Sequence, residues 1–158
     1  MPIVLRFVRS MGLSSDMIVA LEKTAMPFTP SHVEAVTPDG FYLGAHFDGG
    51  VQKRQKNYDA EQFSSQLFLT LDATDAQASS FYAFLDNHIG EPYDWKAILG
   101  FVIPQHEHTL DHAICSALIS LALRGCKWFP WPLATPAHLI DPRDLLLIIS
   151  GRMLVPMG

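Results

Sequence analysis

The sequence predicts an α+β domain in which an antiparallel sheet packs against helices. Three observations carry this expectation. The segment Thr37-Pro38-Asp39-Gly40 is typical of a β-hairpin turn. Strand-like segments flank this turn, and helical patterns dominate the second half of the chain. The order of strand, helix, hairpin, strands, helices and closing strands is typical of the α+β class. Without an internal repeat or a linker, residues 1–158 are expected to form one domain.

Composition and charge exclude several classes of function. The apolar fraction of 49% is enough for a hydrophobic core, and the net charge of -5 argues against a general nucleic-acid binder. No apolar run is long enough to span a bilayer, so no transmembrane segment is expected. The N-terminal apolar stretch is short and interrupted by Arg6, which does not fit a signal peptide. We therefore expect a cytoplasmic protein, or one released without a signal.

The first elements lead to the hairpin. Residues 2–8 read as a strand, and Ser14-Ser15-Asp16 can cap a helix that runs to about Thr24. Pro27 and Pro30 stop this helix. The chain then enters the hairpin.

The hairpin turn fixes a specific register. Pro38 presets the backbone of the turn, Asp39 tolerates the third position and Gly40 takes the left-handed fourth. A three-residue loop of this kind places Thr37 opposite Phe41. Counting outward predicts one face that carries a carboxylate and two imidazoles, made of His32, Glu34, Gly44 and His46. The other face is expected to pack, through Val33, Ala35, Tyr42 and Ala45.

Strands and helices alternate less regularly after the hairpin. We expect a turn at residues 48–50, a short strand from Val51 and another strand over residues 66–71. A helix should start at Asp72 or Thr74 and close at Gly90, followed by a short apolar helix to about residue 101.

The last third begins with a polar loop and a long helix. The loop at residues 103–111 contains His106 and His108 and is followed by His112. These histidines are an alternative metal site, although their spacing is not that of a structural zinc site. A helix is predicted over residues 112–125. Beyond it come an aromatic loop at residues 128–132, a turn or helix start at residues 141–145, and closing strands at residues 146–149 and 153–155. The aromatic loop can line a substrate groove or simply pack.

The two cysteines, Cys115 and Cys126, are expected to be free thiols. If one helix joins them, their separation of eleven residues corresponds to about 16 Å, because a helix rises about 1.5 Å per residue. A disulfide requires Cα atoms within roughly 7 Å. Cys126, late in the helix, is expected to be structural.

Cys115 is the candidate nucleophile. In the first turn of its predicted helix, a thiol feels the positive end of the helix dipole, which favours the thiolate. A thiolate beside an imidazole is the working pair of cysteine hydrolysis, and a third polar group orients the imidazole. The hairpin face offers His32 as the base, with Glu34 or His46 as the orienting group. The sequence alone does not show that hairpin and helix meet.

Several short motifs resemble those of the NlpC-type papain-like cysteine hydrolases in their circularly permuted branch. Ser31-His32-Val33 and Gly49-Gly50-Val51 are similar to the hairpin that carries the family's histidine. Ile114-Cys115-Ser116-Ala117-Leu118 follows them and resembles the Cys-Ser-Glu-Leu pattern of permuted members. Gly90-Glu91-Pro92-Tyr93-Asp94 resembles their Gly-x-x-Tyr-Asp segment. The resemblance implies a permuted papain-like fold and covers scattered blocks between residues 31 and 123.

The chain departs from this family at two positions near the histidine. Gly44 stands where the family usually has its third polar residue, and Glu34 stands where it has glycine. Because the predicted register opposes these two positions, we infer that Glu34 supplies the orienting carboxylate, with His46 as the alternative. A further departure, Ala117 in place of a glutamate, removes no catalytic group. The resemblance also implies that Tyr93 lies near the thiol, where its hydroxyl can help bind an oxyanion or the substrate.

The resulting expectation is a cysteine hydrolase that cleaves an amide in a peptide or peptidoglycan fragment. Cys115, His32 and Glu34 form its triad, and the resemblance implies no metal and no organic cofactor. The expected partners are small peptide, glycopeptide or acyl substrates. An acyltransferase or thioesterase acting on acyl substrates is the nearest alternative. A non-catalytic binding or structural module of the same fold is the other.

Overall fold

A computed structural model describes residues 1–11, 28–46, 49–91 and 110–154 of the chain. This part contains an α+β fold with one five-stranded sheet of order β4-β3-β2-β1-β5, in which all paired neighbours are antiparallel. The strands are β1 (Ile3–Ser10), β2 (His32–Val36), β3 (Tyr42–His46), β4 (Gly50–Arg54) and β5 (Phe63–Leu71). The helices are α2 (Asp75–Asn87), α4 (Leu110–Gly125) and α5 (Pro142–Leu154), with a 3₁₀ turn η1 (Ala137–Leu139) before α5.

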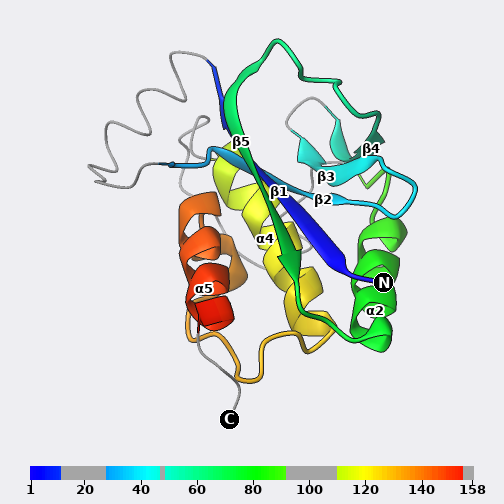
Figure 1. The fold of residues 1–158 in the computed structure, drawn as a ribbon, viewed down its shortest axis with the longest axis vertical. Coiled ribbons are helices and arrows are strands. Elements are labelled where there is room, and N and C mark those ends of the chain that lie inside the picture. Colours follow the sequence, from blue (N-terminus) through cyan, green and yellow to red (C-terminus); the bar gives the residue numbers. More distant parts are fainter. Residues whose placement is uncertain (12–27, 47–48, 92–109, 155–158) are drawn as a thin grey trace.

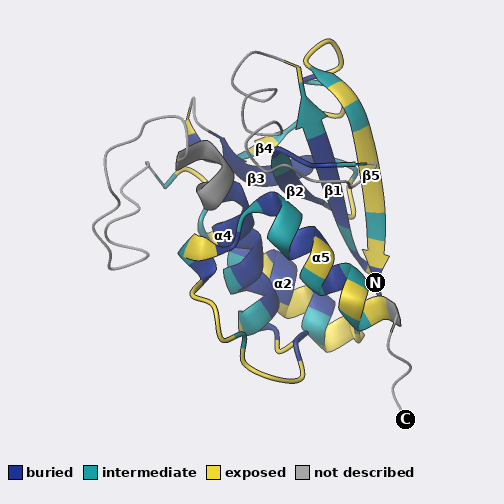
Figure 2. Ribbon diagram, turned by 90° about the vertical axis from the view of Figure 1, so that its left-hand side faces the viewer, coloured by how far each residue is buried: buried dark blue, intermediate teal, exposed yellow. Residues whose placement is uncertain are grey.

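Helices and sheet form two layers with the hydrophobic core between them. Figures 1 and 2 show α2, α4 and α5 on one side of the sheet, and Figure 1 shows α4 between the other two helices. The core joins alternate residues of the strands, such as Leu5, Val33 and Leu43, to Leu118 and Ile119 of α4. Helix α4 packs directly against β2 and β3, which brings the segment around Cys115 to the hairpin.

The predicted hairpin register is confirmed. Ala35 pairs with Leu43 and Val36 with Tyr42, as the predicted turn requires. The Gly40 N–H donates to the Thr37 carbonyl at 2.8 Å, and Gly40 has the positive φ of 85° that the fourth turn position demands. The four turn residues, Thr37 to Gly40, thus set the register of β2 against β3.

One side chain of the hairpin lies on the other face from the one we expected. Tyr42 pairs with Val36, two residues from Glu34, so it shares the polar face. The guanidinium of Arg6 stacks 4.4 Å from the centre of its ring. The expectation that Tyr42 packs on the apolar face was wrong because it broke the alternation of the strand, in which Leu43 takes the core position.

Helix α2 starts where its capping signal predicts. Thr74 is the N-cap, its hydroxyl accepts from the Gln77 N–H, and Gln77 closes a capping box by accepting from the Thr74 N–H. The helix ends at Asn87, and the chain leaves it through Gly90, whose φ is 81°. Its buried residues are Ala78, Phe81, Tyr82 and Leu85.

The predicted closing strands are wrong, because residues 142–154 form helix α5. Asp141 caps its first turn by accepting the Asp144 N–H at 2.7 Å, and Pro142 occupies the first helical position, where its missing N–H costs nothing. Leu145 and Ile149, one helical turn apart, are buried, whereas Leu147 is exposed. This helical period overrides the β propensity of the apolar run.

Several predicted segments lie outside the described residues. They are the helix at residues 14–24, the short helix to residue 101, Tyr93, and the loop histidines His106 and His108. Within the described part, no helix has the length and apolar character needed to cross a membrane.

Candidate functional site

The hairpin brings a carboxylate and two imidazoles together. The Glu34 Oε2 atom lies 3.5 Å from Nε2 of His32 and 3.7 Å from Nε2 of His46. The two imidazole rings have centres 5.0 Å apart. The Glu34 side chain is fully buried, that of His46 is 7% exposed and that of His32 is 18% exposed. His32 is therefore the most accessible member of the group.

Gly44 leaves the space in which the Glu34 side chain starts. A Cβ atom at Gly44 would lie 2.9 Å from the Glu34 Cβ and 3.4 Å from its Cα. Real Cβ atoms do not approach this closely, so a side chain at position 44 and the present position of Glu34 exclude each other. This supports the inference that a missing side chain on one strand is matched by a carboxylate on the other.

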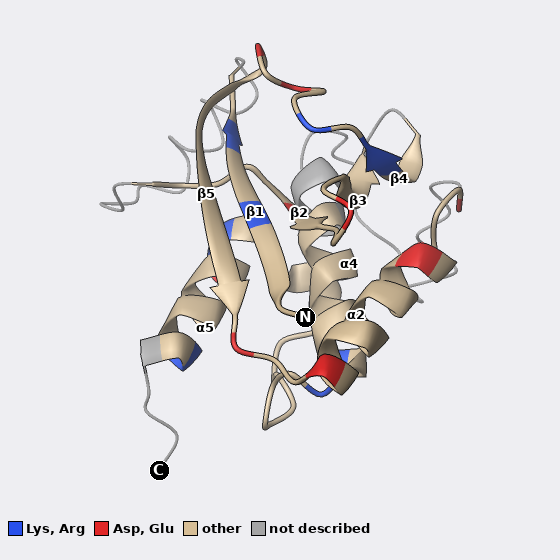
Figure 3. Ribbon diagram, turned by 45° about the vertical axis from the view of Figure 1, so that its right-hand side comes forward, with Lys and Arg blue, Asp and Glu red and all other residues tan. Residues whose placement is uncertain are grey.

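A buried arginine holds the other oxygen of Glu34. Nη1 of Arg6 donates to Glu34 Oε1 at 2.5 Å, and the two terminal nitrogens of Arg6 donate to the two Asp59 oxygens at 3.0 Å each. Nε of Arg6 donates to Gln66 at 2.7 Å. His32 and Arg6 stabilise the ionised carboxylate, so the pKa of Glu34 is lowered even though burial opposes this. Figure 3 shows basic residues on β1 within the sheet and acidic residues at either end of α2.

The loop between β4 and β5 closes this face of the sheet. Besides Asp59, it supplies Tyr58, whose hydroxyl donates to Glu34 Oε2 at 3.2 Å. The Tyr58 ring packs edge-on against that of His46, with centres 5.4 Å apart. Burial and the neighbouring Glu34 raise the pKa of the Tyr58 phenol, which keeps it a donor.

Sequence reasoning missed Arg6, Tyr58 and Asp59 as members of this site. Arg6 carried a signal, because a charged residue in the middle of an apolar strand needs a buried partner. Nothing in the sequence marked Asp59, which joins Arg6 across 53 positions of the chain from an irregular loop.

Cys115 and His32 are in contact. His32 hydrogen-bonds to the Cys115 side chain, and its Nε2 lies 3.5 Å from Glu34 Oε2. Burial lowers the pKa of the His32 ring, but the interactions with the Cys115 sulfur and with the Glu34 carboxylate outweigh burial and raise that pKa to about 10. His32 therefore neighbours both the Glu34 carboxylate, which faces its Nε2, and the Cys115 sulfur.

Cys115 does not lie in the first turn of its helix, as we expected. Helix α4 begins at Leu110, which makes Cys115 its sixth residue. The N–H groups without a helical partner belong to the first four residues, so the amide of Cys115 is not among them. The dipole effect also fades beyond the first turn. The helix end therefore does not act on the Cys115 thiol as expected, whereas His32 contacts it.

Neither cysteine forms a disulfide, as the spacing predicted, and both are buried. The Cys115 side chain has no exposed surface, and Cys126 is 6% exposed. The Cys126 thiol donates to the Leu123 carbonyl, and burial raises its pKa, which suits a structural role. Cys115 is therefore closed to solvent in this structure.

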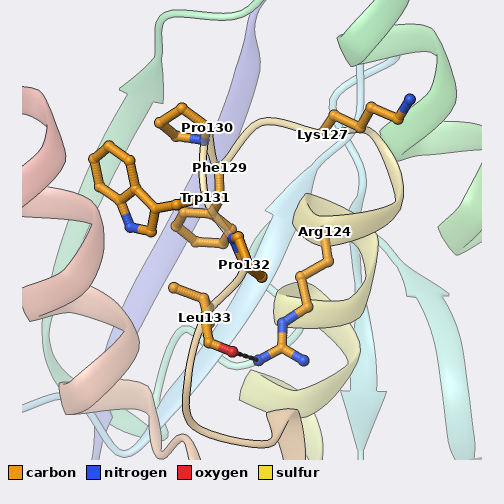
Figure 4. A pocket seen from close by; sticks show the side chains of 7 residues that line it. All are labelled: Arg124, Lys127, Phe129, Pro130, Trp131, Pro132 and Leu133. Carbon is orange, nitrogen blue, oxygen red and sulfur yellow. Dashed lines mark hydrogen bonds between the residues drawn. The ribbon is translucent and has the colours of Figure 1, made fainter.

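The aromatic loop forms a pocket away from Cys115. Trp128 and Phe129 are buried in the core, whereas Trp131 is exposed. Figure 4 shows the pocket between this loop and the C-terminal end of α4, with Arg124 donating to the Leu133 carbonyl. Cys115 lies nine residues before Arg124, about 14 Å along the helix. The loop thus belongs to the other end of α4 and does not line the space at Cys115.

Searches against protein-family models, curated proteins and solved structures found no match to this chain. The functional assignment therefore depends on the geometry of the site and on the sequence motifs.

Proposed function

We propose that the chain is a cysteine hydrolase that cleaves an amide bond in a peptide or glycopeptide substrate. Cys115 is the nucleophile, His32 the base and acid, and Glu34 the group that orients His32. The observation that carries this proposal is the position of His32, which contacts the Cys115 sulfur and whose Nε2 lies 3.5 Å from the buried Glu34 carboxylate. This support is independent of the position of Cys115 in its helix.

The reaction uses the proton that the pair shares. The thiolate attacks the carbonyl carbon, and His32 delivers its proton to the departing amine as the C–N bond breaks. The acyl group remains on sulfur as a thioester. His32 then takes a proton from water, whose oxygen attacks the thioester and releases the acid and the thiolate.

Glu34 is preferred to His46 as the orienting group for a reason of geometry. Glu34 contacts Nε2 of His32 and is itself fixed by Arg6 and Tyr58. His46 contacts the same carboxylate oxygen, so its effect on His32 passes largely through Glu34. Replacing Glu34→Gln should therefore slow acylation of Cys115 more than His46→Asn does, and the reverse order would transfer the role to His46.

The same pair would serve an acyltransferase or a thioesterase, which differ from an amidase in the leaving group and in the acceptor. The complete burial of Cys115 favours a different alternative, a binding or structural module that retains the pair without turnover. All three enzymes require that an acyl group can reach the Cys115 sulfur, whereas the binding or structural module does not.

Mass spectrometry after exposure to an activated acyl ester separates them. We expect an acyl adduct on Cys115 with p-nitrophenyl acetate, lost in Cys115→Ala, slowed in His32→Asn and unchanged in Cys126→Ser. Failure of folded wild-type protein to acylate at Cys115 would favour the module. A panel of peptide amides and acyl thioesters then identifies the leaving group that turns over fastest.

A further inference from the structure

We propose that His32, Glu34 and His46 form a binding site for a divalent transition metal ion of the Zn²⁺ type. Binding of the ion at this site and use of His32 by Cys115 exclude each other. The binding site itself follows from the geometry of the hairpin. Only its inhibitory consequence rests on the proposed function.

The spacing of the three ligand atoms suits a metal better than it suits hydrogen bonds. His32, Glu34 and His46 each offer one ligand atom, and these three atoms all lie within 4.8 Å of one another. The two nitrogen–oxygen distances, 3.5 and 3.7 Å, are longer than a good N–H···O bond of about 2.7–3.2 Å. Ligands held at about 2.0–2.2 Å from a tetrahedral Zn²⁺ are separated by about 3.4 Å. A small inward movement of three side chains would complete the coordination.

The charge around the cluster favours a cation. Arg6 brings one positive charge, and the Glu34 and Asp59 carboxylates bring two negative charges. Arg6 occupies Oε1 of Glu34 and is itself clamped by both oxygens of Asp59, so Oε2 is the oxygen directed at the histidines. With both imidazoles neutral, as zinc ligands are, the set carries one net negative charge, so His32 must release its proton as the ion binds.

Surrounding groups hold the ligands in place. The Tyr58 hydroxyl donates to the coordinating oxygen of Glu34, and its ring packs against His46. Contacts of this kind orient the ligands of metal sites. All three ligands also stand on paired strands rather than on a loop, so little order is lost when the ion binds. Three protein ligands leave a fourth position for water, which is the pattern of an open zinc site.

The consequence for the thiol follows from the position of the ion. An ion between Oε2 of Glu34 and Nε2 of His32 takes the nitrogen lone pair that otherwise carries the proton facing Glu34. The ring then cannot be the imidazolium that balances a Cys115 thiolate. The ion should therefore act as a reversible inhibitor of the reactive thiol rather than as a catalytic cofactor.

Metal titration of the untagged, metal-free protein tests the binding site. We expect calorimetry to give one Zn²⁺ per chain and Co²⁺ to give visible absorption bands of a four- or five-coordinate site. His46→Asn should weaken Zn²⁺ binding at least about tenfold. His88→Asn, which changes a histidine outside the cluster, and the double variant His106→Asn/His108→Asn should bind as the wild type does.

Two outcomes would overturn the proposal: no Zn²⁺ binding by folded wild-type protein, or binding that survives in folded His46→Asn but is lost in the double variant. Circular dichroism establishes that each variant is folded. Cys115→Ala should still bind Zn²⁺, because the thiol is not one of the three ligands. Binding can therefore fail while acylation succeeds, or succeed while acylation fails, and the two proposals are tested separately.

Discussion

His32 is the residue on which the electrostatics of the site converge. Its ring contacts a sulfur that is negative when ionised and a carboxylate that Arg6 keeps ionised. Both neighbours stabilise the imidazolium, and together they outweigh the cost of burying it. Arg6 supplies the buried positive charge for the acidic residues, because it forms ion pairs with both Glu34 and Asp59.

The titration of His32 follows from these contacts. The pKa of the ring should be about 10 in the folded protein, compared with a usual value of 6.5. NMR of the imidazole in metal-free buffer measures it, with assignment by comparison with His32→Asn. In Cys115→Ala the charge attraction from sulfur is absent, so we expect the pKa to fall by more than about one unit. An equal pKa in both proteins would show that the sulfur does not act on the ring.

The sign of the effect on stability is fixed by the direction of this shift. The folded state binds the His32 proton more tightly than the unfolded state does. The contribution of His32 to the free energy of unfolding is therefore complete below pH 6.5 and is lost as the pH rises toward about 10. Glu34 has the opposite effect, because the pKa of its carboxyl is lowered in the folded protein. Its contribution to the free energy of unfolding is present above the usual pKa of a glutamate and is lost as the pH falls through the lowered pKa.

Removing Arg6 should be costly. Arg6→Met leaves Glu34 and Asp59 buried without their cation, and breaking a buried ion pair from one side costs about 3–5 kcal/mol. Lys53→Met is the control, since Lys53 pairs with Asp39 on the surface and its loss should leave the free energy of unfolding close to that of the wild type. Urea denaturation compares the two. Equal stability of both variants would mean that the buried network contributes nothing.

The hairpin is the element that could be predicted most fully from sequence. Its register follows from the backbone preferences of Pro38 and Gly40, which act locally and need no tertiary contact. Helix α5 shows the opposite case. Its apolar run, Leu145 to Ile149, suits a strand or a helix equally well, and only burial of one side of the run against the core decides between them.

Substitution at Gly44 tests the hairpin geometry. In Gly44→Ala the new Cβ meets the Glu34 side chain at 2.9 Å, so we expect a loss of about 1–3 kcal/mol in the free energy of unfolding. Gly151→Ala is the matched control in α5, where no atom lies within 4 Å of the new Cβ, and alanine should stabilise the helix by up to about 1 kcal/mol. A neutral Gly44→Ala would refute the close strand approach.

At the scale of the whole molecule, the packing of α4 brings Cys115 to His32. Sequence motifs indicated these two residues, but their contact depends on how α4 packs against β2 and β3, and no local sequence pattern encodes that packing. The same packing buries Cys115 completely, and no motif around the cysteine predicts that burial. The Arg6–Asp59 contact also depends on the complete fold, because the loop that carries Asp59 has no regular structure to predict.

Alkylation of the two cysteines by iodoacetamide near neutral pH is the most direct test of the proposal that Cys115 and His32 form a reactive pair. Both thiols are buried, so exposure alone does not distinguish them. We predict that Cys115 is modified at least about tenfold faster than Cys126, and that His32→Asn removes this advantage, because the thiolate is the reacting form. Equally slow modification of both cysteines in the folded wild-type protein would contradict the claim that His32 activates Cys115.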